Sequence, residues 1–110
     1  MDRSRFASVT RTLTGTGTIV EVSGELDAEA APSLRRVLIT AIVKGGLVEV
    51  DLSRLTFADS HGLGALIDAK SFADDYRVNM RVTAVTPAVQ RLLQLTNVPD
   101  LAGEPIQHTA

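Results

Sequence analysis

The sequence predicts a single α/β domain, with a mixed sheet of four to five strands packed against about three to four helices. Its 110 residues are the length of one domain with a sizeable core. Apolar residues make up 45% of the chain, as in folded rather than disordered proteins. Strand-like runs alternate with amphipathic helical stretches, a pattern typical of parallel strands joined by right-handed crossovers.

The first two strands are expected to form a hairpin. The runs "ASVTRTL" at 7–13 and "TIVEVSG" at 18–24 flank the Gly-containing segment "TGTG". Gly15 and Gly17 lead into a strand and not into a helix, which favours a turn over a phosphate-binding loop. An antiparallel hairpin joined to parallel strands makes the sheet mixed.

The first helix is predicted over 31–44. One apolar face is formed by residues at helical spacing, namely Leu34, Val37, Leu38, Ala41 and Ile42. Pro32 is suited to the first turn, and Gly45 with Gly46 supplies the stop.

The remaining elements follow in the same alternation. "LVEVDL" at 47–52 has the length and composition of a strand, and a helix is expected from about Ser60 to Tyr76. A strand at 80–85 precedes Thr86-Pro87, an N-cap and a first-turn proline that open a helix to 96. We expect frayed ends at about 1–5 and about 99–110, with a short strand possible near Leu101.

Composition excludes several classes of function. There is no Cys, which rules out disulfides and thiolate chemistry. Aromatic residues are 4% of the chain and the net charge is −2 without a basic run, which argues against nucleic acid as a partner. No apolar run is long enough for a membrane span and no secretory signal is visible, so a cytoplasmic location is expected. The two His residues lack metal-ligand spacing, so neither a metal nor a cofactor is expected.

The segment "DSHGLG", 59–64, raises the question of function. Each Gly in a helix interior costs about 1 kcal/mol relative to Ala. Ser60 can serve as the N-cap of the helix, at the end that carries free N–H groups and a partial positive charge. Gly62 and Gly64 either leave this end bare for another protein or serve helix–sheet packing. Adjacent Asp, Ser and His side chains at a helix start diverge and no G-x-S-x-G elbow is present, so we expect no enzyme.

Three stretches carry a family resemblance. They are "VEVSGELDAEAAPSLRRVL", "VEVDLSRLTFADSHGLGALI" and "VTPAVQRLLQLTNV", and together they span roughly 20–98. In this order they resemble the anti-sigma factor antagonists of STAS type, the small domain of bacterial partner-switching systems that regulate transcription in stress responses and sporulation.

The resemblance implies a phosphorylation switch. The serine after the motif's aspartate, here Ser60, would be phosphorylated by a partner anti-sigma factor with serine kinase activity, and a PP2C-type phosphatase would reset it. The unphosphorylated form would bind the anti-sigma factor and release the sigma factor. The implied partner-binding residues are Glu25, Asp27, Asp59, His61, Gly62, Leu63 and Gly64. The alternative is an unphosphorylated STAS adaptor subunit of a lipid-transport or stress-signalling complex.

Two features depart from the family pattern. His61 stands where the family usually has Ser or Thr, and an imidazole beside a phosphate is expected to blunt the switch or make it pH-sensitive. The sequence after 98 also looks too short for the family's last helix.

Overall fold

The computed structural model describes residues 8–95 of the chain. Within this range the elements run β1 (Ser8–Leu13), β2 (Gly17–Leu26), α1 (Ala31–Lys44), β3 (Leu47–Ala58), α2 (Ser60–Tyr76), β4 (Met80–Val85) and α3 (Pro87–Leu95). The predicted α/β class, the four strands and the three helices are confirmed. The ends predicted to fray and the short strand near Leu101 lie outside the described residues.

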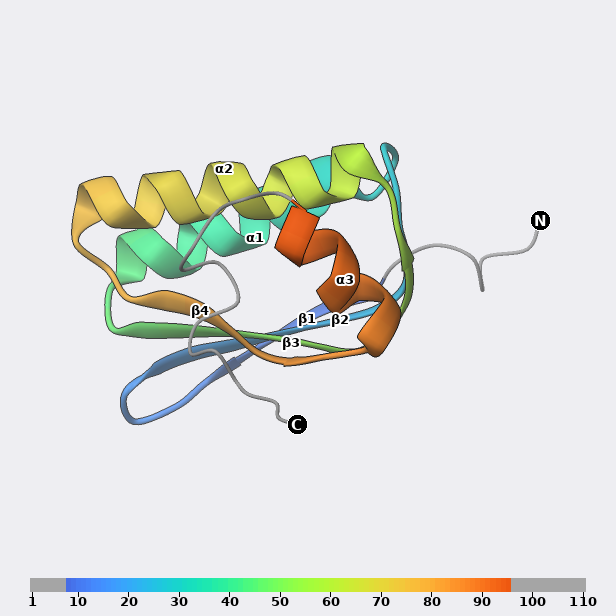
Figure 1. Ribbon diagram of the computed structural model, residues 1–110. Coiled ribbons are helices and arrows are strands. Elements are labelled where there is room, and N and C mark those ends of the chain that lie inside the picture. Colours follow the sequence, from blue (N-terminus) through green and yellow to red (C-terminus); the bar gives the residue numbers. More distant parts are fainter. Residues whose placement is uncertain (1–7, 96–110) are drawn as a thin grey trace.

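The sheet has the order β1-β2-β3-β4. β1 pairs with β2 in antiparallel fashion, whereas β2–β3 and β3–β4 are parallel pairs. Because the parallel strands advance in one direction across the sheet, right-handed crossovers place both connecting helices on the same face. Figure 1 shows α1 and α2 side by side over that face, with α3 on the same side.

The core lies between this helical layer and the sheet. Alternate residues of β2 and β3 point into it, and α1 and α2 contribute their apolar faces. The largest fully buried side chains are Leu26, Leu34, Leu38, Ile42, Leu52, Leu55, Leu66, Met80, Val20, Val22 and Val48. Burying aliphatic side chains of this size stabilises a fold by about 1.5–3 kcal/mol each.

The helix boundaries follow from the residues that predicted them. Pro32 lies in the first turn of α1, and Gly45 ends that helix with a φ of 92°, a conformation that favours glycine. The Thr86 hydroxyl accepts the Val89 N–H at 3.4 Å, as an N-cap at the start of α3 does.

Two strands are longer than predicted. β3 was expected to end at 52 and continues to Ala58, so that 56–58 is strand and not loop. β2 was expected over 18–24 and likewise continues through Glu25 to Leu26. The extra length comes from pairing across two irregularities in the β2–β3 register. A simple alternating pattern in one strand cannot reveal these irregularities, since they depend on the neighbouring strand.

Candidate functional site

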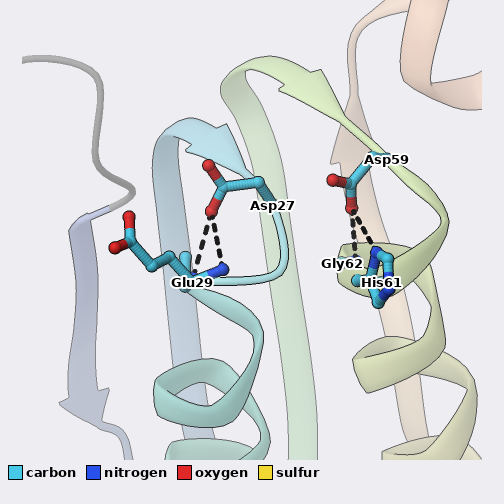
Figure 2. A network of polar contacts seen from close by, with 6 residues as sticks. Asp27, Glu29, Asp59, His61 and Gly62 are labelled. Carbon is cyan, nitrogen blue, oxygen red and sulfur yellow. Dashed lines mark hydrogen bonds and ion pairs between the residues drawn. The ribbon is translucent and has the colours of Figure 1, made fainter.

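Two aspartates mark the carboxyl edge of the sheet, where parallel strands β2 and β3 end together. Leu26 and Ala58 are partners in the register, and the next residues along the two strands are Asp27 and Asp59. The Asp59 N–H donates to the Leu26 carbonyl at 3.1 Å, which ties the two chain segments together. Figure 2 shows the two carboxylates on neighbouring turns, each at the entrance to a helix.

Asp59 is the N-cap of α2. Its backbone is extended, with φ −107° and ψ −175°, and its Oδ1 accepts the Gly62 N–H at 2.9 Å. The prediction that Ser60 caps this helix is therefore wrong. Asp and Ser are equally good caps, and the strand extends to Ala58, so Asp59 is the residue at which the backbone changes from extended to helical.

Ser60 consequently occupies the first helical position, and its side chain is exposed. Two N–H groups of this turn are engaged, since Gly62 donates to the Asp59 carboxylate and Leu63 donates to the Asp59 carbonyl at 3.0 Å. The Ser60 hydroxyl thus lies on a backbone fixed on one side by the sheet and on the other by the capped turn.

The two glycines of the motif have different surroundings. A Cβ added to Gly62 would meet the Leu26 carbonyl oxygen and would lie 2.6 Å from the Leu26 Cγ. A Cβ added to Gly64 would meet nothing within 4 Å. Packing explains Gly62, whereas only Gly64 leaves open space on the helix surface.

Burial also divides the predicted partner-binding residues. Gly62 is buried and Leu63 is only 7% exposed within the core, so neither offers a side chain to another protein. The family resemblance predicts both on the partner surface, whereas the helical turn directs them toward the sheet. The His61 side chain is 70% exposed, and its Nδ1 lies 3.9 Å from the Asp59 Oδ1.

Asp27 has a structural role that sequence reasoning missed. Its Oδ1 accepts the N–H groups of Glu29 and Ala30, both at 3.1 Å, and so closes the turn that leads into α1. The helix N-cap itself, Ala30, has no side-chain cap. An aspartate followed by a short turn and a helix with proline in its first turn is a pattern that predicts such a side-chain-to-backbone contact.

The charge at this edge is one-sided. Residues 24–29 and 56–62 contain the carboxylates Glu25, Asp27, Glu29 and Asp59 and no Lys or Arg. In the described part of the chain, no group of three or more His, Asp or Glu residues is arranged to hold a metal ion. None of the described helices is long and apolar enough to cross a membrane. The edge is suited to contact with a positively charged partner surface.

Comparison with known proteins agrees with this geometry. A family model described as "Mlab, STAS domain" matches residues 9–103. The chain belongs to the STAS domain family. This STAS domain is 31% identical over 83 residues to an anti-sigma-B factor antagonist of Staphylococcus epidermidis. The matched region covers 74% of this chain and 77% of that protein. The resemblance expected from the motifs is confirmed.

Solved structures share the fold. An anti-sigma factor antagonist from Mycobacterium paratuberculosis matches the STAS domain with a TM-score of 0.79 at 24% identity, covering 99% of this chain and 92% of that one. The Bacillus cell fate determinant SpoIIAA in its phosphorylated form matches with a TM-score of 0.69 at 21% identity, covering 84% of this chain and 86% of that one. At these identities the likeness concerns the fold.

Proposed function

We propose that this STAS domain is an anti-sigma factor antagonist that is switched off by phosphorylation of Ser60. Its unphosphorylated form binds an anti-sigma factor in the cytoplasm and thereby releases a sigma factor. The bound anti-sigma factor is also the serine kinase, and a PP2C-type phosphatase removes the phosphate. The observation that carries this proposal is the exposed Ser60 hydroxyl at the first position of α2, held in place by the Asp59 cap.

A phosphate on Ser60 would change binding more than folding. It adds about −1.5 to −2 charges, so the formal charge of −2 becomes about −3.5 to −4. The helix N-terminus tolerates negative charge, and the similar fold of phosphorylated SpoIIAA supports a switch without refolding. A partner surface complementary to a neutral hydroxyl does not tolerate the same charge, because desolvating it without a counter-charge is costly.

The surface proposed for the partner is narrower than the motif alone implied. It comprises Glu25, Asp27, Asp59, His61 and Gly64, around Ser60. Gly62 and Leu63 support it from inside, as packing residues of the first turn of α2.

Phosphate mapping tests this proposal directly. The full chain is incubated with ATP and each purified anti-sigma factor kinase of its own organism, and the modified residue is identified by tandem mass spectrometry. We expect phosphate on Ser60 and none on the Ser60→Ala variant. Ser33, an exposed serine in the first turn of α1, is the matched control, and Ser33→Ala should be modified like the wild type. Phosphate on Ser4 or Ser53 with none on Ser60 would overturn the switch.

The second candidate function is an unphosphorylated STAS adaptor within a lipid-transport or stress-signalling complex. Two observations favour it: the matching family model is described by "Mlab" and not by an antagonist, and His61 replaces the usual hydroxyl residue. The same experiment separates the two candidates. A wild-type chain that binds a partner yet accepts no phosphate from any of the kinases would favour the adaptor.

A further inference from the structure

The last residues of β3 contain a bulge directly before the candidate site. Gly24 of β2 pairs with Leu55 of β3, but the next residue, Glu25, pairs with Phe57. Thr56 is therefore an extra residue on β3, with no partner of its own in the register. A bulge of this kind bends a strand and re-aims the side chains that follow it.

The bulge reverses which side chains enter the core. Side chains of a regular strand alternate between faces, so with Leu55 buried, residue 57 would point to the helices and residue 58 away from them. Instead Leu55 and Ala58 are buried, at 0% and 5% exposure, and Phe57 is 49% exposed. The strand thus directs its largest apolar side chain to the face that α1 and α2 leave uncovered, and places the small Ala58 in the core.

Two contacts hold the bulge in this form. Gly24 has a φ of 88°, a conformation that residues with a Cβ rarely adopt. The Thr56 hydroxyl donates to the Gly24 carbonyl at 3.0 Å. Together they fix the outward direction of Phe57 from both strands, so the exposure of this aromatic ring is built into the backbone.

The ring lies within reach of any interface centred on Ser60. Only Ala58 and Asp59 lie between the two positions, so their Cα atoms are at most about 10 Å apart. A standard interface buries about 800 Å² on each partner, a patch roughly 30 Å across. The cross-strand neighbour of Phe57 is Glu25, one of the carboxylates of segments 24–29 and 56–62, which contain no Lys or Arg.

We propose that Phe57 is the apolar anchor of the partner-binding surface, and that the anti-sigma factor meets it with an apolar pocket edged by Lys or Arg side chains. This inference rests on the proposed function. Binding energy concentrates in a few aromatic or charged anchors surrounded by polar groups that exclude water. An exposed aromatic ring set among carboxylates has this composition, and it predicts a partner that combines apolar surface with positive charge.

The test compares two exposed aromatic residues. Phe57→Ser removes the proposed anchor, whereas Tyr76→Ser removes a ring of similar exposure, 53%, at the opposite end of α2. Affinity is measured by calorimetry with the purified anti-sigma factor that binds the wild-type chain. We expect Phe57→Ser to weaken binding about 30-fold or more and Tyr76→Ser to leave it unchanged. Phe57→Leu, which keeps an apolar side chain, should restore affinity to within about threefold.

The outcomes are distinct. Thermal unfolding and far-UV circular dichroism confirm that each variant is folded at the temperature of the titration. Wild-type affinity in Phe57→Ser, or equal losses in Phe57→Ser and Tyr76→Ser, would overturn the anchor while leaving the proposed function intact. If the wild-type chain binds none of its organism's anti-sigma factors, the proposed function fails, and the anchor with it. Affinity that does not fall with rising salt would contradict the basic rim of the pocket.

Discussion

At the junction between β2 and α1, Asp27 follows the strand and residues 28–30 separate it from the helix, whereas at the junction between β3 and α2, Asp59 follows the strand and the helix begins at once. Both carboxylates accept backbone N–H groups of the turn that follows. The first aspartate closes a turn, and the second caps a helix. Only at the second junction does a single residue, Asp59, connect the strand to the first helical residue.

This difference explains why Ser60 is a better candidate for a switch than Ser33, the exposed serine in the first turn of the other helix. Ser33 lies in the first turn of α1, but behind a three-residue turn and a helix start with no side-chain cap. Ser60 is joined to the sheet through Asp59, whose N–H donates to the Leu26 carbonyl. A hydroxyl that a kinase and a binding partner must both recognise is better presented from the rigid junction.

The largest expected difference between the two junctions is in the affinity for the anti-sigma factor. Ser60→Asp brings a carboxylate into the proposed interface, whereas Ser33→Asp adds the same charge to the first turn of the other helix. We expect Ser60→Asp to weaken anti-sigma factor binding by several kcal/mol, which is about a hundredfold or more. The added carboxylate is desolvated where the proposed partner surface fits a neutral hydroxyl, and not at the basic side chains that edge the Phe57 pocket. Ser33→Asp should bind within about threefold of the wild type. Isothermal titration of both variants decides, and equal losses would mean that net charge and not position controls binding.

The next largest expected effect is on stability, and it compares the packing of the two glycines in the first turn of α2. Gly62→Ala forces a methyl group against the Leu26 carbonyl and side chain, and we expect a loss of about 1–3 kcal/mol in the free energy of unfolding. Gly64→Ala has open space and gains helix propensity, so it should stabilise the protein by up to about 1 kcal/mol. Urea unfolding of the two variants measures the difference. Equal behaviour of both would show that the first turn of α2 does not rest on β2 in solution.

The helices illustrate what could be predicted from sequence. The bounds of α1 and α2 match the expected 31–44 and 60–76, because apolar spacing, Pro32 and Gly45 are all local signals. The ends of the strands could not be predicted in the same way. The bulge at Thr56 depends on Gly24, a residue of another strand more than 30 positions away, and it moves Phe57 from the expected loop to the surface of the sheet.

The candidate site shows the same division. The motif 59–64 correctly located a serine at a helix start, but both Asp59 and Ser60 are suitable caps, and strand length decides between them. Whether Gly62 faces a partner or the core likewise depends on its contact with Leu26, which no pattern within the motif reveals. The sequence therefore predicted which residues form the candidate site. It did not predict which of them are buried packing residues and which are exposed to a partner.

The smallest expected effect separates the cap from the switch. Asp59→Ala removes the acceptor of the Gly62 N–H and should lower the free energy of unfolding by about 0.5–2 kcal/mol. Ser60→Ala removes an exposed hydroxyl that caps nothing, so its stability should stay within about 0.5 kcal/mol of the wild type. Asp27→Ala is the control from the other junction, and its loss should resemble that of Asp59→Ala, because it too frees backbone N–H groups. Differential scanning calorimetry of the three variants, together with Asp59→Asn, which keeps a capping oxygen, ranks them. If Ser60→Ala loses more than Asp59→Ala, then Ser60 caps α2 in solution, its hydroxyl is engaged in the helix, and the kinase would have to open the first turn before it could reach the oxygen.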